Sequence, residues 1–273
     1  TIIYLNLDKS HINKMMFLDM KNDMIELSIV LKNKKLYNSL IQKEDIMPYK
    51  ILIFDADHTL FDFDQSEEIA FMKLLKDINL ENDHHKLFPI YIEKNKETWS
   101  ELEQGILSQS KLKTERFQRF IDASGIQAKA IDLTSIYTKH LASASILFKD
   151  AYNLIEQLSK KYRIVIVTNG LKEVQSERIV KSILAPFIET TIISDEIGIM
   201  KPDPKIIDYA LDKINHKSKD DVVIIGDSLT SDIQCGFNAG IDTIWYNPNS
   251  KKNTLDKDPT YTISKLNSLL EIL

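Results

Sequence analysis

The sequence predicts an α/β fold: a doubly wound parallel sheet flanked by helices, with an all-helical cap inserted after the first core strand. Three apolar runs, KILIFDAD, RIVIVTNG and DVVIIGDS, are rich in β-branched residues and turn polar at their C-terminal ends. Such runs are typical of parallel strands buried on both faces. The segment 63–145 interrupts this rhythm, because it has helix-period stretches and no strand pattern.

The remaining core elements follow in order along the chain. Weaker strands are expected at 190–194 (TTIIS) and 242–246 (DTIWY). Strands that alternate with helices indicate a Rossmann-like sheet, in which the carboxyl ends of the strands share one edge. Amphipathic patterns predict the core helices over Ala151 to Lys161, Leu171 to Ile183, Pro204 to Ile214 and Ser231 to Ala239.

The inserted segment defines the predicted domains. Its helical stretches include EEIAFMKLLKDI and LKTERFQRFIDASG, in which Gly125 is a helix stop. Because the insertion follows the first strand, we expect it to lie over the carboxyl edge of the sheet as a lid. The predicted domains are a core of residues 48–62 and 146–273 and a cap of residues 63–145.

The first 47 residues are harder to interpret. TIIYLNL and MIELSIVL fit strands or short helices, and periodicity does not decide between them. We expect the catalytic unit to begin near Met47, with residues 1–47 as an N-terminal extension. An arm that packs on the core is an equally good interpretation.

Composition narrows the function classes. The chain has 273 residues, 43% of them hydrophobic, and a net charge of −5 with no basic run, which argues against a nucleic acid polymer as partner. No apolar run approaches the roughly 20 residues that span a bilayer, so no membrane partner is expected. The single cysteine, Cys235, cannot form an internal disulfide, and no signal-peptide pattern is recognised. A cytoplasmic location is expected, whereas the oligomeric state is unreadable.

Polar side chains follow the predicted strands where each strand ends. In a doubly wound sheet these ends meet, so four carboxylates, a hydroxyl and an ammonium are expected to converge. One lysine cannot neutralise four carboxylates. Because the ligands are oxygens, Mg²⁺ is the natural counter-ion when phosphate is the second partner. The residues concerned are Asp55, Asp57, Thr168, Asn169, Lys201, Asp227 and Asp232.

Four segments, FDADHTLFD, VTNG, MKPDP and GDSLTSD, resemble in this order the four motifs of the haloacid dehalogenase superfamily of phosphohydrolases. The resemblance covers the chain from about Tyr49 onward. It implies that Asp55 attacks phosphorus to form an aspartyl-phosphate. Asp57 would protonate the leaving oxygen and later activate water. One departure is His58, where the family often has glycine. We interpret it as a turn position that tolerates side chains, with a contact to the phosphate or the leaving group as the alternative.

The resemblance also implies roles for the other motif residues. Thr168, together with Asn169, would bind the phosphoryl oxygens of the substrate, and Lys201 would steady the nucleophile and the transferring group. Asp227 would bind Mg²⁺ with Asp55 and the main-chain carbonyl of Asp57. Asp232 would not bind the metal directly but would orient Lys201 or a metal-bound water.

Some residues have structural interpretations. Asp62 and Asp64 are expected to cap the N-terminus of the first helix of the inserted segment rather than to bind metal. Cys235 is expected to pack a helix, and Trp245 to be a core residue of an edge strand.

Within the superfamily, Asp57 argues for phosphate chemistry rather than dehalogenation, although phosphoglucomutases keep both aspartates. The cap pattern W-x5-G-I-L-S with R-F further on, together with GDSLTSDI and DTIWYNP, is similar to the bacterial 5′-nucleotidase branch that hydrolyses pyrimidine nucleoside monophosphates. Trp99 and Arg116 would then contact a small phosphorylated substrate, although helix packing is the better interpretation for each residue taken alone.

Two other functions stay open. Sugar-phosphate phosphatases that act on N-acylneuraminate 9-phosphate are also similar to this chain. A phosphoacceptor signalling domain also combines acidic residues, a threonine and a lysine on a doubly wound sheet. The cap-sized insertion and Asp57 oppose that last interpretation, because Asp57 would speed the loss of a phosphoryl group that a switch must retain.

Overall fold

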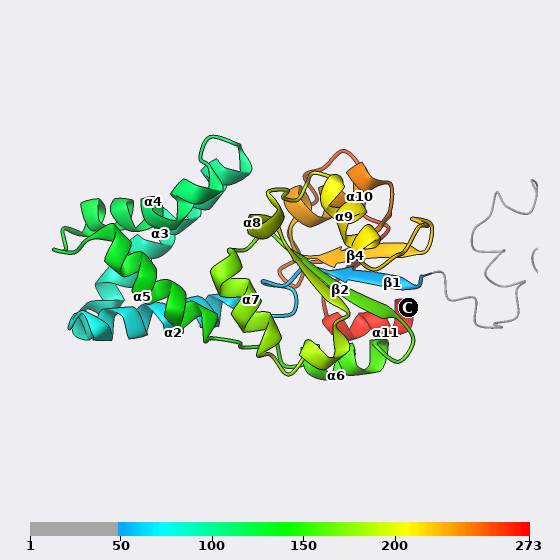
Figure 1. Cartoon of the computed structure of the whole chain (residues 1–273), viewed down its shortest axis with the longest axis horizontal. Coiled ribbons are helices and arrows are strands. Elements are labelled where there is room, and N and C mark those ends of the chain that lie inside the picture. Colours follow the sequence, from blue (N-terminus) through cyan, green and yellow to red (C-terminus); the bar gives the residue numbers. More distant parts are fainter. Residues whose placement is uncertain (1–48) are drawn as a thin grey trace, which may run out of the picture. The chain divides into compact units, whose positions relative to one another are not determined.

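The computed structural model describes residues 49–273, so the predicted N-terminal extension lies outside the described residues. Within this range the strands form one parallel sheet in the order β3-β2-β1-β4-β5-β6. Figure 1 labels its central strands β2, β1 and β4. Phe54 at the end of β1 is in register with Ile166 and Ile225, so neighbouring strands end at similar heights. The strands are β1 (Ile51–Phe54), β2 (Arg163–Thr168), β3 (Thr190–Ile193), β4 (Val222–Gly226), β5 (Asp242–Tyr246) and β6 (Tyr261–Ile263).

The strand order confirms the doubly wound sheet. The chain runs outward from β1 through β2 to β3, returns to β4 on the other side of β1, and continues to β5 and β6. The order therefore reverses beside β1, which is where ligands bind in such sheets. One prediction for this sheet was wrong: β6 pairs with β5, so Trp245 lies on an inner strand rather than an edge strand.

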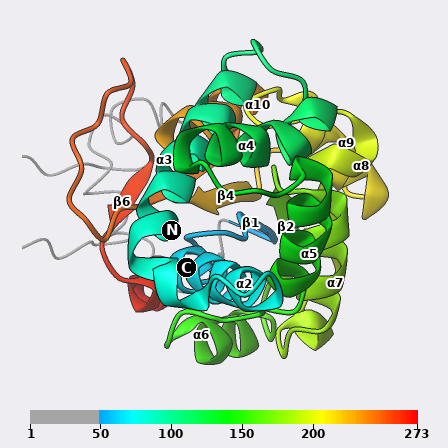
Figure 2. The same ribbon diagram turned by 90° about the vertical axis from the view of Figure 1, so that its left-hand side faces the viewer.

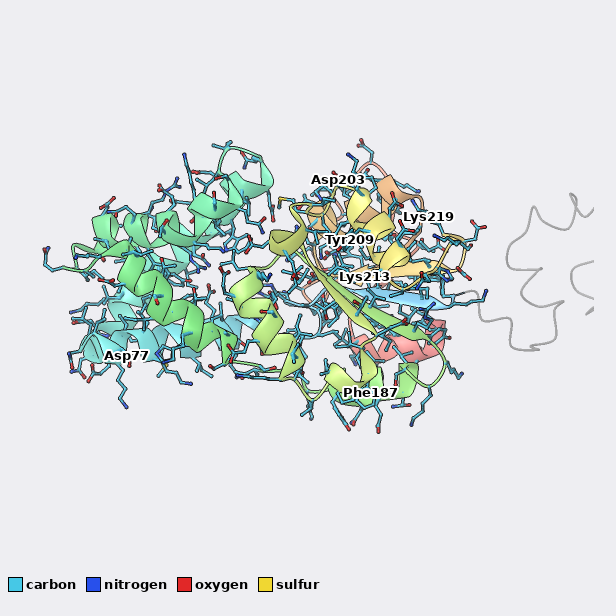
Figure 3. All side chains as sticks on the ribbon, in the orientation of Figure 1. Asp77, Phe187, Asp203, Tyr209, Lys213 and Lys219 are labelled. Atoms are coloured by element: carbon cyan, nitrogen blue, oxygen red, sulfur yellow. The ribbon has the colours of Figure 1, made fainter. Side chains whose placement is uncertain are left out.

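Both faces of the sheet are buried, which explains why its strands read as continuous apolar runs. Side chains alternate along β1, so Leu52 and Phe54 face one side and Ile51 and Ile53 the other. The first side packs against α6 (Ala151–Leu158), η5 (Leu266–Ser268) and α11 (Leu269–Ile272). The second packs against α9 (Lys205–Lys213) and α10 (Gln234–Ala239). Figure 3 labels Phe187 and Tyr209, which mark these two sides.

Four α-helices lie between β1 and α6, and we call them the cap helices. They enclose a third apolar core, to which Leu171 and Val174 also contribute. Figures 1 and 2 show them beyond the carboxyl ends of the central strands. The cap helices are α2 (Phe63–Asp77), α3 (His84–Glu103), α4 (Gln109–Ser124) and α5 (Ala130–Ala142).

Local signals set the ends of the cap helices. The carboxylate of Asp62 accepts a hydrogen bond from the Gln65 amide at 3.0 Å, which confirms Asp62 as the cap of α2. Asp64 instead lies in the first turn of that helix. Helix α4 ends at Ser124, and Gly125 follows it in the left-handed conformation as the predicted helix stop. None of the helices within residues 49–273 is long and apolar enough to cross a bilayer.

The shorter elements connect the core. The predicted helix beginning at Ser231 starts instead as a π-helical turn, η4, before α10 takes over. Helix α7 lies between the sheet and the cap helices, since Ile179 packs in the sheet core and Val174 in the cap core. These elements are η2 (Glu81–Asp83), α7 (Lys172–Val180), η3 (Ala185–Phe187), α8 (Ser194–Ile197) and η4 (Leu229–Ile233).

Candidate active site

A cavity of about 390 Å³ lies at the carboxyl ends of the strands, between the strand loops and the cap helices. Its wall combines charged groups from the core with aromatic, aliphatic and charged side chains from the cap helices. The structure thus brings the residues singled out in the sequence to one cavity. Those that line it are Asp55, Asp57, Trp99, Arg116, Thr168, Asn169, Lys201, Asp227 and Asp232.

Lys201 is the central charge of this cavity. Its ammonium donates hydrogen bonds to Asp55 Oδ1 at 2.6 Å, Asp232 Oδ1 at 2.7 Å and the Val167 carbonyl at 2.7 Å. The side chain is 1% exposed. Burial disfavours its charge, but the carboxylates of Asp232 and Asp55 outweigh burial and raise the pKa of Lys201 above its usual range. Lys201 is therefore a fixed cation that holds Asp55 in place.

Three carboxylates gather around this lysine. Asp55, Asp227 and Asp232 each offer one oxygen, and these oxygens lie within 4.8 Å of one another. Burial raises the pKa of Asp55 to about 8, although Lys201 opposes this, and burial with the charge of Asp232 raises the pKa of Asp227 to about 6. The site therefore has more negative charge than Lys201 can balance. Clustered carboxylate oxygens of this kind fit a hard divalent cation such as Mg²⁺.

A glycine lets Asp232 approach the end of β4. A Cβ atom on Gly226 would lie 2.2 Å from Asp232 Oδ2, closer than side-chain atoms can pack. The same oxygen accepts a hydrogen bond from the Ser228 amide at 3.0 Å. On the neighbouring strand, the indole of Trp245 donates to the Asp227 carbonyl at 2.9 Å. The loop after β4 is thus held from both sides.

The loop after β2 fixes Lys201 through its backbone. Asn169 Oδ1 accepts from the Lys201 amide, and Asn169 Nδ2 donates to the Lys201 carbonyl, both at 2.9 Å. Nδ2 also lies 3.2 Å from Ser231 Oγ. Buried Thr168 accepts from the Gly170 amide at 3.1 Å. The geometry of Asn169 favours positioning of Lys201 over direct substrate binding.

Sequence reasoning missed the partners of Asp57. Gln175 Nε2 donates to Asp57 Oδ2 at 2.6 Å, and Arg178 Nη2 donates to Asp57 Oδ1. Arg178 is fully buried, and its guanidinium lies over the rings of Phe61 and Phe63. Both residues come from α7. A usable sequence signal was present, because Gln175 and Arg178 lie next to Val174 and Ile179 on the apolar face of that helix.

His58 adopts the left-handed backbone conformation, with φ of 61°, which favours glycine. Its Nε2 lies 2.9 Å from Asp64 Oδ1, and its ring packs edge-on against Phe63. Burial lowers the pKa of His58, but the hydrogen bond to Asp64 and the charge of Asp227 raise it overall. His58 is thus in a turn, as expected, and is held there by Asp64 while it lines the cavity.

The cap side of the cavity contains a second cluster of polar side chains, which the sequence did not predict to lie together. Glu67 of α2 and Asn95 of α3 line the cavity together with Arg116 of α4. Trp99 is half-buried against the cap core and also lines the cavity, whereas Phe117 packs inside that core. Of the cap residues in the predicted pattern, Trp99 and Arg116 thus line the cavity, whereas Phe117 does not.

Comparisons with known proteins agree on one family. The model of the haloacid dehalogenase-like hydrolases matches residues 49–240. Pyrimidine 5′-nucleotidase PynA of Streptococcus pneumoniae is 36% identical over 83% of this chain and 96% of the relative. N-acylneuraminate-9-phosphatase of Mus musculus is 31% identical, but over 47% of this chain and 52% of the relative.

Among solved structures, the fold matches HAD-hydrolase YfnB of Bacillus subtilis, whose crystal structure bound to magnesium reveals interdomain movement. The TM-score is 0.76 with 34% identity, over 82% of this chain and 98% of the other.

Proposed function

Because the chain belongs to the haloacid dehalogenase-like hydrolase family, we propose that it hydrolyses pyrimidine nucleoside 5′-monophosphates through an aspartyl-phosphate. The observation that carries the chemistry is the Lys201 ammonium, 2.6 Å from Asp55 Oδ1 at the base of the cavity. A buried lysine in this position keeps a carboxylate oriented and adds positive charge where a phosphoryl group would arrive. We also propose that the cap helices form the separate cap predicted for residues 63–145.

The proposed reaction has two steps. An oxygen of Asp55 bonds to phosphorus while the bond to the leaving oxygen breaks, and Asp57 gives that oxygen a proton. Asp57, now a carboxylate, then takes a proton from a water molecule that attacks the aspartyl-phosphate. Inorganic phosphate leaves and Asp55 is restored. Gln175 and Arg178 each donate to a different oxygen of Asp57, which leaves a second lone-pair site on each oxygen for the proton that is transferred.

The acidic cluster supports Mg²⁺ as cofactor. We assign Asp55, Asp227 and the main-chain carbonyl of Asp57 as its protein ligands, and Asp232 as the residue that orients Lys201. When bound, the ion would offset the charge of the phosphate and of the clustered carboxylates. Asn169 positions Lys201 through its backbone, and the Thr168 hydroxyl binds the phosphoryl oxygens.

Substrate choice must come from the cap side, because Asp55 meets only the phosphoryl group. Trp99 can stack a base and Arg116 can donate to a base carbonyl. Similarity to the pyrimidine nucleotidase of S. pneumoniae extends over nearly the whole of that relative, and this supports the nucleotide assignment. N-acylneuraminate 9-phosphate is the second candidate substrate, supported by a similarity that covers about half of that relative. The cytoplasmic location stays a prediction.

The test is a comparison of kcat/KM for UMP, dTMP, AMP and N-acylneuraminate 9-phosphate. Pyrimidine nucleotides are expected to be preferred by about ten- to a hundredfold, the range that contacts of 1 to 3 kcal/mol supply. Asp55→Asn should abolish turnover without changing the thermal midpoint by more than a few degrees. A preference for the acyl sugar phosphate would replace the nucleotidase assignment, and normal turnover in Asp55→Asn would overturn the nucleophile.

A further inference from the structure

Three polar side chains interrupt the apolar stripes of three cap helices at the cavity wall. They are Glu67, Asn95 and Arg116, which are 5%, 6% and 1% exposed. On its own helix each occupies a position where core packing calls for an apolar residue, as Glu67 does beside Ala70 and Phe71. Buried polar groups at such positions need a partner.

Arg116 lacks that partner among residues 49–273. Its Nε and Nη2 make no hydrogen bond there. The guanidinium carbon instead lies 5.2 Å from the ring centre of Phe117 and 5.0 Å from that of Tyr137. Aromatic faces attract a cation but accept no strong hydrogen bond from it. A buried guanidinium with unfilled donors beside a cavity is therefore poised for an acceptor on a ligand.

Asn95 offers the complementary group. Its Nδ2 donates to Glu67 Oε1 at 2.7 Å, and the Tyr137 hydroxyl lies 3.5 Å from the same oxygen. Because Nδ2 can only donate, this bond fixes which end of the Asn95 amide faces Glu67. The other end, Asn95 Oδ1, has no partner among the described residues. Asn95 Oδ1 is thus an acceptor that is held in one orientation and has no donor among these residues.

We propose that Arg116 and Asn95 read the ring edge of the base, Arg116 donating to a carbonyl and Asn95 Oδ1 accepting from the adjacent ring N–H. Glu67 is a positioning residue that sets the orientation of the Asn95 amide. The inference rests on the proposed nucleotidase function and deepens it. Its ligand chemistry is a carbonyl next to a ring N–H, as in uracil and thymine rings, and a ring that lacks this N–H leaves Asn95 Oδ1 unfilled.

The test compares UMP with 3-methyluridine 5′-monophosphate, in which a methyl group replaces the N3 hydrogen. Wild-type enzyme is expected to prefer UMP by at least about tenfold in kcat/KM, because the analogue leaves a buried acceptor unpaired. Asn95→Ala should bring the ratio close to one, since the acceptor is gone and space for the methyl is created. Asn153→Ala, an exposed asparagine on α6, is the matched control and should keep the wild-type ratio.

Glu67 is tested by rescue. Glu67→Ala should weaken the discrimination, whereas Glu67→Gln should retain it because its amide oxygen still accepts from Asn95. A purely structural role would change stability in Glu67→Ala without changing the UMP to 3-methyl-UMP ratio. The wild-type comparison needs no variant, so it decides even where a variant fails to fold.

Equal turnover of UMP and its 3-methyl analogue by the wild type, with UMP still a good substrate, would overturn this inference alone. An unchanged ratio in Asn95→Ala would do the same. Absence of UMP hydrolysis would overturn both the inference and the proposed function.

Discussion

Arg178 forms an ion pair with Asp57, so the proposed acid and base of the reaction contacts a fully buried guanidinium from a helix that also packs against the cap helices. The pair joins residues that are 121 positions apart. Gln175, one turn earlier on the same helix, occupies the other carboxylate oxygen. A Cβ atom on Gly170 would lie 2.3 Å from Gln175 Nε2, so the glycine of the VTNG segment makes room for this contact.

Arg178→Met is therefore expected to lower kcat for UMP by about tenfold or more, with a smaller change in KM. The reason is that Asp57 loses the group that orients it, and proton transfer of this kind contributes about 10²- to 10⁴-fold to rate. Steady-state kinetics check the split between kcat and KM. Arg119→Met is the control, because Arg119 pairs with Glu101 on the cap helices and lies outside the cavity lining. A rise in KM with unchanged kcat would assign Arg178 to substrate binding instead.

Activity should require a divalent cation, and exhaustive chelation is expected to abolish it until Mg²⁺ is restored. Asp227→Ala should raise the Mg²⁺ concentration needed for half-maximal activity by about tenfold or more. Loss of a group that only supports a metal ligand already costs about 10- to 100-fold in metal affinity, and Asp227 is proposed as a ligand itself. Titration of activity with Mg²⁺ measures this. Asp220→Ala removes an exposed aspartate just before β4 and should leave the titration unchanged. Full activity in chelator would contradict the metal assignment.

Gly226→Ala is expected to remove most activity and to lower the free energy of unfolding by about 1 to 3 kcal/mol, the usual cost of overpacking. The new methyl would displace Asp232 and with it one of the two carboxylates that hold Lys201. Urea unfolding and kcat/KM for UMP measure the two effects. Gly105→Ala is a useful comparison, because its Cβ would meet nothing within 4 Å and only backbone strain at φ of 71° would be felt. Wild-type activity in Gly226→Ala would show that Asp232 is dispensable.

The raised pKa of Glu67 predicts that the free energy of unfolding depends on pH. Burial raises the pKa of Glu67 to about 7 from its ordinary value of 4.5, although Arg116 opposes the shift. Between these values the folded protein holds a proton that the unfolded chain has lost, so stability is fully present below pH 4.5 and is lost as pH rises through 7. A shift of this size corresponds to about 3 kcal/mol.

The measurement is urea unfolding of wild type and Glu67→Gln at several pH values from 4 to 8. Because glutamine cannot ionise, the difference in unfolding free energy should move in favour of the variant by up to about 3 kcal/mol across this range. Glu68→Gln, an exposed neighbour on α2, should show little change. A constant difference between wild type and Glu67→Gln would mean that Glu67 ionises normally in the folded protein.

Much of the core half of the cavity followed from the sequence. Each motif residue comes directly after an apolar run, and parallel strands bring their carboxyl ends to one edge whatever the details of packing. Asp55, Thr168 and Asp227 could therefore be placed together from chain order. The strand β6 could not be predicted with them, because its three residues carry too short a pattern and only pairing with β5 makes them a strand.

The sequence by itself determined the fold, the family and the groups that meet at the strand tips, since these depend on local pattern and on chain order. Only the tertiary structure decided what surrounds them: Arg178 on Asp57, and Glu67 with Asn95 beside Arg116 at the cap wall. Each of these residues is a polar side chain on an apolar helix stripe. Periodicity shows that such a residue is buried, but it does not show which other helix face the residue contacts. The partner across that interface determines whether the polar group serves packing, catalysis or recognition.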